Sequence, residues 1–331
     1  MLTKIECRSE WDIMYIGILM PEMVFQEISN YQQNIKPLSV FKNNINFHSH
    51  ETLLFKEKYI PFVYDLTEEI DLFINKRVQI ITKNGKGFIS LTLESSNKEE
   101  ISYNFSSANV LCSDIKGMRF LKKNGIKRIA MRGEFLNGDA IFSKYQSLLN
   151  ILNFASKNFE EAIFRLSDIN NESIIGERGS ALLLNSKKEI LYEELNCVIE
   201  SQKNYYNLSV LCPFVRTGDE SIKIYHCIKQ VFSGKIGCMI EVPLIIFEGK
   251  KLAHLFDYFV IGISDLSQLL QGADRNHYAV QDSTILFIAE LLEKYLLPYV
   301  NDDKIIYITS KPLFDLLKLK NNTQKILYLT K

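Results

Sequence analysis

The hydrophobic pattern alternates regularly between two forms from residue 101 onward. The longer stretches carry apolar residues at every third or fourth position, which predicts amphipathic helices over 107–124, 139–157 and 281–297, among others. Eight shorter apolar runs lie between them: 101–105, 127–132, 161–166, 206–214, 235–242, 258–264, 304–309 and 325–330. Each has the length of a strand, and strands that alternate with helices predict an α/β fold, here a (β/α)₈ TIM-type barrel.

The first 95 residues follow a different pattern, with strand-like runs that favour a small separate domain. The runs at 77–82 and 87–94 flank Asn84-Gly85, a dipeptide typical of the tight turn of a β-hairpin. The polar segment 94–100 has the composition of a linker. We therefore expect two domains, 1–95 and 96–331.

Charge and composition narrow the range of functions. Lys and Arg together number 39, as do Asp and Glu, so the net charge is zero and no nucleic-acid partner is expected. The six cysteines have no CxxC spacing, which argues against a zinc site and fits a reducing compartment. We find neither a signal-peptide pattern nor an apolar run of about 18 residues, so we expect a cytoplasmic protein without a membrane partner.

Two carboxylates stand at the ends of neighbouring expected strands. Glu241 lies at the end of the fifth apolar run, and Asp265 comes directly after the sixth. In this type of barrel the chemistry takes place at the carboxyl ends of the strands, where adjacent ends lie about 5 Å apart. Both side chains could therefore bind one hard cation, and we expect Mg²⁺ or Mn²⁺. The alternative is a pair of solvated loop acids.

Arginines recur at the same ends of the strands. They close or follow the second, third, fourth and sixth runs, at Arg132, Arg165, Arg178, Arg216 and Arg275. A charged side chain is costly inside a barrel, but at the mouth it can bind an anion. Several arginines beside a divalent cation predict a pocket for a small molecule with phosphate and carboxylate groups. Any one of them alone could instead form a salt bridge at the rim.

The segments around these residues resemble the phosphoenolpyruvate-utilising enzymes, which comprise phosphoenolpyruvate synthase, pyruvate phosphate dikinase and Enzyme I of the sugar phosphotransferase system. The resemblance covers 101–277 and rests on motifs in the family's order: MRGEFL, IFRLSD, GERG, CPFVRT, GCMIEVP and DYFVIGISDLSQLLQGADR. It extends upstream, where HSHETLLFKEKYIPFV (48–63) resembles the family's swivelling phosphohistidine domain. There Ser49-His50 falls on the Ser-His pair, and Pro61 follows at the family's spacing.

The resemblance implies roles for particular residues. Glu241 and Asp265 would hold Mg²⁺, and His50 would carry a phosphoryl group as a catalytic residue. The substrate pocket would contain phosphoenolpyruvate or an analogue, bound by Arg132, Arg165, Arg178, Ser264 and Arg275. Of these, Arg165 would also be catalytic. The resemblance further implies a homodimer through the barrel and a separate protein that binds nucleotide or accepts the phosphoryl group.

The sequence departs from the family pattern at several of these positions. Ser264 replaces an Asn whose amide could contact substrate, and Thr309 stands in the place of the catalytic cysteine. Glu51 follows His50, and its carboxylate would repel an incoming phosphate. We therefore weigh a phosphotransferase-like protein with phosphoryl or enolate chemistry against two alternatives. One is a binding or regulatory homologue that has lost turnover, and the other is a Mg²⁺-dependent carbon–carbon lyase acting on pyruvate or its enolate.

Overall fold

The structure is a computed structural model of the chain. It describes residues 4–8, 13–18, 40–41, 62–63, 77–83, 86–91, 109–135, 141–169, 177–273, 281–309, 317 and 325–328. The chain divides into two compact units, Met1–Ser106 with Lys331 and Ser107–Thr330. Within the described residues, no helix is both long enough and apolar enough to cross a membrane.

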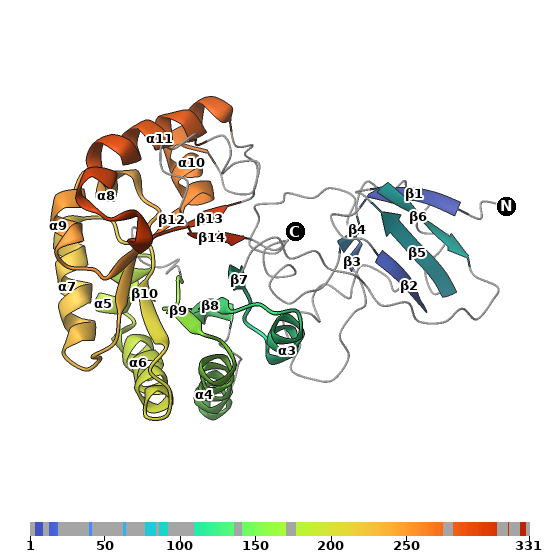
Figure 1. Cartoon of the computed structure of the whole chain (residues 1–331), viewed down its shortest axis with the longest axis horizontal. Helices are drawn as coiled ribbons and strands as arrows, with labels where there is room; N and C mark the ends of the chain where they lie inside the picture. The colour runs from blue at the N-terminus through green and yellow to red at the C-terminus, as the bar shows by residue number, and fades with distance from the viewer. Residues whose placement is uncertain are drawn as a thin grey trace. The chain divides into compact units, whose positions relative to one another are not determined.

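The first unit contains an antiparallel sheet with the strand order β1-β6-β5-β2 (Figure 1). Its strands are β1 (Lys4–Arg8), β2 (Ile13–Ile18), β5 (Arg77–Lys83) and β6 (Lys86–Leu91). Two short parallel strands, β3 (Val40–Phe41) and β4 (Phe62–Val63), form a second sheet. Lys83 pairs with Lys86 in the antiparallel register, so Asn84-Gly85 connects the two strands and the expected hairpin is confirmed. The expected phosphohistidine role of this unit stays a prediction, because His50 lies outside the described residues.

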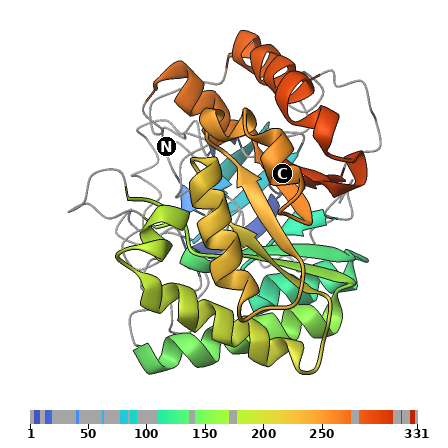
Figure 2. The same cartoon turned by 90° about the vertical axis from the view of Figure 1, so that its left-hand side faces the viewer.

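The second unit is a closed parallel barrel (Figures 1 and 2). Its strands follow the order of the chain, and β14 closes the ring beside β7 through the pair Tyr328 and Val110. The strands are β7 (Asn109–Leu111), β8 (Arg128–Arg132), β9 (Glu161–Arg165), β10 (Leu208–Cys212), β11 (Ile236–Ile240), β12 (Tyr258–Gly262), β13 (Ile305–Thr309) and β14 (Lys325–Tyr328). The barrel predicted from the alternating pattern is therefore confirmed.

Helices cover the outer side of this barrel, and α4 and α6 lie side by side on it (Figures 1 and 2). The described α-helices are α3 (Ile115–Lys123), α4 (Ile141–Asn158), α5 (Ser180–Leu184), α6 (Lys188–Gln202), α7 (Gly218–Lys229), α8 (Pro243–Ile246), α9 (Gly249–Ala253), α10 (Ile263–Gln271) and α11 (Asp282–Tyr295). Short 3₁₀ helices are η2 (Gly133–Phe135), η3 (Leu297–Tyr299) and η4 (Asp302–Lys304).

The first barrel strand differs from the sequence-based expectation. The apolar run at 101–105 was expected to supply it and 107–124 to be helical, but β7 is formed by Asn109–Leu111. The run at 101–105 lies outside the described residues. Val110 and Leu111 are buried and pair with β8, so their apolar character belongs to a strand. The helix begins only at Ile115, where the Asp114 carboxylate caps it by accepting from the Gly117 N–H at 2.8 Å.

The interior of the barrel is a packed core. Its buried side chains come from all the strands between β7 and β13: Leu111, Ala130, Ile163, Leu211, Met239, Tyr258, Val260 and Ile306. Tyr258 brings a hydroxyl into this core, and it donates to Ser209 Oγ at 3.1 Å or to the Val210 carbonyl at 3.0 Å. Burial raises the pKa of Tyr258, so this hydroxyl stays protonated. Because the core is filled, polar ligands are confined to the two ends of the barrel.

Candidate functional site

Two arginines lie side by side at the carboxyl ends of β8 and β9. Arg132 and Arg165 are the last residues of these strands and face each other in the parallel register. They are only 5% and 7% exposed, respectively. A buried guanidinium is stable only where carboxylates or other acceptors compensate its charge. The loops that follow the two strands supply such groups.

Arg165 is held between two carboxylates. Its Nη2 forms an ion pair with Glu134 Oε1 from η2, and its Nη1 lies 3.5 Å from Glu241 Oε1 at the end of β11. Met239 Sδ accepts from the same Nη1 at 3.5 Å. Burial by itself would lower the pKa of Arg165, but Glu134 and Glu241 more than offset it and raise that pKa. Arg165 therefore carries a positive charge in a fixed orientation at the barrel mouth.

A third arginine, Arg178, makes a bidentate contact with a carboxylate. Arg178 donates from Nε and Nη2 to the two oxygens of Asp168, at 3.0 and 2.8 Å. Its Nη2 also lies 3.6 Å from Asp265 Oδ1. The guanidinium carbon stands 3.8 Å from the centre of the Phe214 ring, a cation–π distance. Burial would lower the pKa of Arg178, whereas the hydrogen bonds to Asp168 raise it.

Phe214 contacts both Arg178 and Glu241, and its backbone conformation is unusual. Phe214 has a φ of 43°, in the left-handed region that bulky residues rarely adopt. In this conformation the Phe214 N–H donates to Glu241 Oε2 at 3.1 Å. Gly179, with a φ of +53°, must lack a side chain because a Cβ there would lie 2.6 Å from Phe214 Cβ. Strained positions of this kind cluster at functional sites.

Glu241 is the most buried charged residue of this cluster, with 2% of its surface exposed. Burial and then the nearby charge of Asp265 raise the pKa of Glu241 to about 8, although Arg165 acts in the opposite direction. Gly262 at the end of β12 makes room for it, since a Cβ there would approach Glu241 Cγ to 2.8 Å. Asp265 follows in the first turn of α10. The carboxylates of Glu241 and Asp265 are hard oxygen donors at neighbouring strand ends, a pair suited to a divalent cation.

The composition of the cluster suits a metal ion at Glu241 and Asp265. Glu134, Asp168, Glu241 and Asp265 bring four carboxylates to the end of the barrel that also carries Arg132, Arg165 and Arg178, and ion pairs join them to Arg165 and Arg178. The described part of the chain contains no group of three or more His, Cys, Asp or Glu side chains placed to hold a metal by themselves. A cation at Glu241 and Asp265 would thus need further oxygen ligands from water or a bound molecule. Mg²⁺ is the common ion that binds in this way.

The structure brings together most of the residues expected from the sequence. Arg132, Arg165, Arg178, Glu241 and Asp265 lie at the carboxyl ends of neighbouring strands, and Ser264 directly precedes Asp265 in α10. Thr309 ends β13, but its side chain is outside the described residues, as are Arg275 and His50. Arg216 pairs instead with Glu220 of α7, with 2.9 Å between Nε and Oε2. What these residues bind stays a prediction.

The sequence interpretation gave no role to three residues that the geometry makes important. Glu134 holds Arg165, Asp168 holds Arg178, and Phe214 contacts both Arg178 and Glu241. All three were within quoted motifs: MRGEFL, IFRLSD and CPFVRT. Each acid stands two or three residues after an arginine, which was the available signal. The partner of each acid depends on loop geometry that the spacing does not contain.

Comparison with a protein-family model identifies this part of the chain. Residues 111–300 match the model described as PEP-utilising enzyme, PEP-binding domain. This is more than half of the chain, and it contains every described residue of the cluster.

Individual proteins match over shorter stretches. The phosphoenolpyruvate-protein phosphotransferase of Mycoplasma pneumoniae is 28% identical over 41% of this chain and 23% of its own length. The probable phosphoenolpyruvate synthase of Staphylothermus marinus is 33% identical over 31% of this chain and 13% of its own length. The matching region thus spans less than a quarter of either relative. Among solved structures, an HpcH/HpaI aldolase from Desulfitobacterium hafniense aligns over 66% of this chain and 84% of its own, with 10% identity and a TM-score of 0.38.

Proposed function

The chain belongs to the PEP-utilising enzymes through their PEP-binding domain, and we propose that its barrel binds phosphoenolpyruvate or a close analogue together with Mg²⁺ or Mn²⁺. The single observation that supports this most is the pair of arginines held by carboxylates at the barrel mouth. Arg165 is fixed by Glu134 and Glu241, and Arg178 by Asp168. Because their orientations are set before binding, they can receive an anion at little entropic cost.

The remaining donors of these guanidiniums would bind the ligand's oxygens. A guanidinium is planar and can contact two oxygens of a phosphate or carboxylate at once. Arg132, Arg165 and Arg178 would bind the phosphate and enolate oxygens, and Ser264 and Arg275 would be further contacts of the substrate. In phosphoryl transfer, fixed positive charge of this kind stabilises the charge spread over the phosphoryl oxygens.

Glu241 and Asp265 would hold the metal ion, which supplies charge neutralisation at the phosphate and enolate oxygens when it is bound. The chain's own contribution is to keep both carboxylates in place. The Phe214 N–H and Arg165 orient Glu241, and Arg178 orients Asp265. Loss of either contact would loosen the metal ligands without removing them.

We propose a phosphotransferase-like activity in which His50 acts as the phosphoryl carrier. A ring nitrogen of His50 would form a bond to phosphorus while the bond from phosphorus to the enolate oxygen breaks, leaving the enolate of pyruvate. Ser49-His50 and its spacing to Pro61 support this role. The family's proton donor, a cysteine, is replaced by Thr309, which favours slow turnover or binding without turnover as the second candidate.

Thermal unfolding with a panel of ligands tests this proposal. We expect phosphoenolpyruvate and oxalate, a planar dianion that resembles the enolate, to raise Tm when Mg²⁺ is present, because a ligand that binds only the folded state stabilises it. Arg165→Lys should reduce the shift, since an ammonium cannot replace the planar fork. Arg119→Lys, on the exposed side of α3, is the matched control. Absence of any shift with all ligands in the wild type would refute the proposal.

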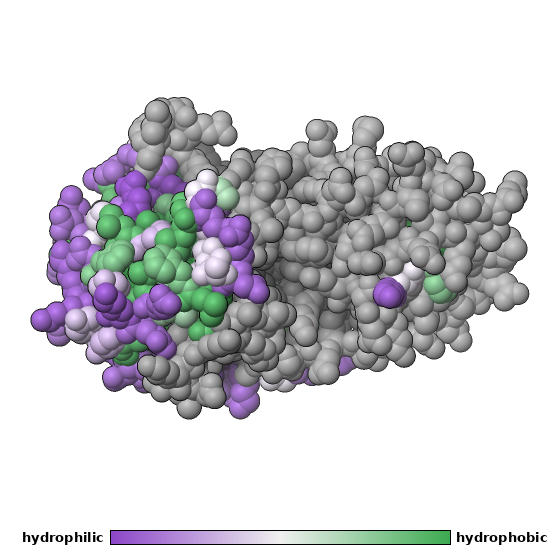
Figure 3. Space-filling model, turned by 90° about the horizontal axis from the view of Figure 1, so that it is seen from above, coloured by the Kyte–Doolittle hydropathy of each residue, from purple (hydrophilic) through white to green (hydrophobic). Residues whose placement is uncertain are grey.

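A second copy of the chain is the partner that we propose for the barrel's apolar outer face. This face carries exposed apolar side chains of α8 and the residue that follows it, and of α10, α11 and η3: Leu244, Phe247, Leu269, Leu286, Phe287 and Tyr299. Figure 3 looks onto it and shows apolar side chains gathered within a hydrophilic border. The zero net charge of the chain removes repulsion between two copies. Phe287→Glu should convert a dimer into a monomer in light scattering, and a monomeric wild type would exclude the homodimer.

A further inference from the structure

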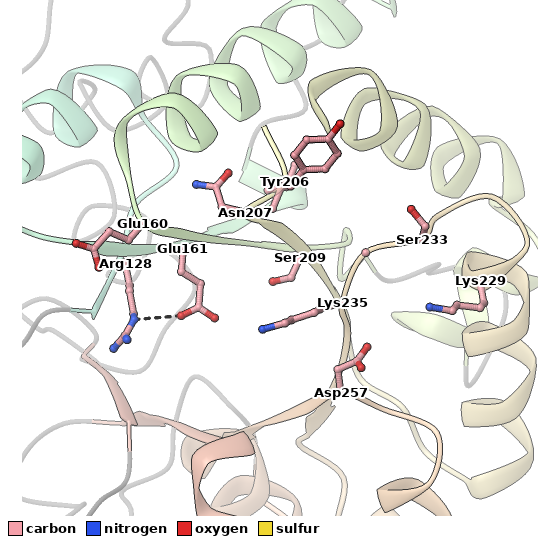
Figure 4. A pocket seen from close by; sticks show the side chains of 12 residues that line it. Arg128, Glu160, Glu161, Tyr206, Asn207, Ser209, Lys229, Ser233, Lys235 and Asp257 are labelled. Carbon is pink, nitrogen blue, oxygen red and sulfur yellow. Dashed lines mark ion pairs between the residues drawn. The ribbon is translucent and has the colours of Figure 1, made fainter. Parts of the chain in front are cut away.

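A polar pocket lies at the amino-terminal end of the barrel, away from the cluster described above. Its volume is about 570 Å³, which is ample for a small metabolite. Among its lining residues are Arg128 and Glu161, the first residues of β8 and β9, and Asp257, which directly precedes β12 (Figure 4). Arg132 and Arg165 close the same two strands at the opposite end. This pocket is therefore separate from the candidate site.

Some charges of the pocket are already neutralised. Arg128 Nε pairs with Glu161 Oε2 at 3.1 Å, and Glu160 pairs with Lys127 at 2.9 Å. Asp257 Oδ2 accepts from the Ile236 N–H at 2.8 Å, which fixes the carboxylate but leaves its charge. Lys229 and Lys235 also line the pocket, and neither forms an ion pair with any carboxylate in the part of the chain that the structure describes. Their ammonium groups are available to a ligand.

Side chains that can bind a phosphate and side chains that can bind hydroxyl groups lie in different parts of the pocket. Figure 4 shows Lys229 and Ser233 on one side of the pocket and Arg128 with Glu161 on the other, with Lys235 and Asp257 in the middle. A lysine and a serine hydroxyl suit a phosphate group. The carboxylates of Glu161 and Asp257 can only accept hydrogen bonds, so they require donors such as hydroxyl groups. Tyr206 at the edge is 89% exposed and offers a ring face to a sugar.

We propose that this pocket binds a small phosphorylated sugar, with its phosphate at Lys229 and Ser233. Its hydroxyl groups donate to Glu161 and Asp257 and accept from Lys235. Inorganic phosphate alone satisfies one side and leaves the carboxylates to repel it, and an uncharged sugar leaves Lys229 unused. A mostly apolar ligand is excluded, because nearly all the side chains that line the pocket are polar.

Calorimetric titration of the whole chain with glucose 6-phosphate tests the proposal. We expect saturable binding that is tighter than the binding of either glucose or inorganic phosphate. It should persist with saturating oxalate and Mg²⁺, since those ligands would occupy the other end of the barrel. Equal affinity for phosphate and glucose 6-phosphate would overturn the assignment of a sugar, and displacement by oxalate with Mg²⁺ would move the binding to the candidate site.

Two variants separate the two sides of the pocket. Lys229→Gln should weaken glucose 6-phosphate by about tenfold, the effect of one lost charge-assisted contact, while it leaves glucose unchanged. Asp257→Asn should weaken the binding of both sugars, but it should not weaken the binding of inorganic phosphate, which is relieved of a repelling charge. Lys250→Gln, which removes an exposed lysine of α9 outside the pocket, is the control for net charge. If Lys229→Gln and Lys250→Gln bind glucose 6-phosphate equally well, the pocket is not its site. Neither outcome bears on the proposal that phosphoenolpyruvate binds at the carboxyl end of the barrel.

Discussion

Asp168 shows how single acids set the geometry of the barrel mouth. It accepts two hydrogen bonds from Arg178 and is itself only 8% exposed. Its carboxylate therefore fixes the plane of the guanidinium as well as compensating its charge. Glu134 likewise orients the guanidinium of Arg165 and compensates its charge. The sequence indicated the arginines because they recur at strand ends, but it could not indicate which acid turns toward which arginine.

Removal of the Asp168 charge should loosen Arg178. Asp168→Asn keeps the size of the side chain but leaves one oxygen acceptor in place of the charged pair. We expect the free energy of unfolding to fall by about 1–3 kcal/mol, as for the loss of a hydrogen bond between charged groups. Chemical denaturation would measure it. Asp219→Asn is the control, because the Asp219 side chain is 86% exposed in its pair with Lys251 and should change stability little.

The buried carboxyl of Glu241 predicts a pH dependence of stability. Its pKa is about 8 in the folded chain, against an ordinary value of 4.5. Between these values the folded chain retains a proton that the unfolded chain has lost, so stability should fall as pH rises through this window. Unfolding without divalent cations at several pH values would measure the slope. Glu241→Gln should flatten it, and an equal slope in that variant would assign the effect to another group.

Thr309, which stands in place of the family's cysteine, should limit the rate of pyruvate formation. A hydroxyl has a pKa far above the thiol's value of about 8.5, so threonine cannot replace cysteine as a proton donor to an enolate. We expect very slow release of pyruvate from phosphoenolpyruvate, and we expect Thr309→Cys to increase it. A coupled assay for pyruvate would follow both proteins. Release at about 1–1000 per second by the wild type would contradict this reading of Thr309.

At the scale of elements, the alternation of apolar runs was sufficient for the barrel but not for its first strand. The run Asn109–Leu111 is short and continues into a helix, so its periodicity resembled that of the helix. Only its pairing with β8 and β14 identifies it as a strand. Such pairing is a long-range property that a local pattern does not contain. The hairpin of β5 and β6 was predictable because the Asn-Gly turn is local.

The cap of α3 should matter because it separates this strand from the helix. Asp114 ends the extended segment and accepts from the Gly117 N–H. Asp114→Ala should lower the free energy of unfolding by about 1 kcal/mol, the usual cost of an N-cap loss. Thr217→Ala, at the corresponding cap of α7, should cost a similar amount. Denaturant titration would compare them, and no change in either variant would contradict the role of the caps.

At the scale of the whole molecule, the barrel separates two kinds of polar chemistry. The carboxyl ends of the strands carry guanidiniums held by buried carboxylates, whereas the amino ends carry exposed lysines and acids that are exposed or partly exposed. The packed core lies between them. The residues at the carboxyl ends could be predicted from the sequence, because both the family resemblance and the charged residues at the ends of the expected strands indicated them. The residues at the amino ends could not, since they come from the starts of strands and the loops before them and follow no motif.

The central claim is that the carboxyl end of the barrel binds a metal ion and an anion together. Calorimetry of oxalate with and without Mg²⁺ tests it most directly, in the wild type and in Asp265→Ala. The account predicts that Mg²⁺ increases the affinity of the wild type for oxalate by at least about tenfold, and that this coupling disappears in Asp265→Ala. An oxalate affinity that is the same with and without Mg²⁺ in the wild type would contradict it.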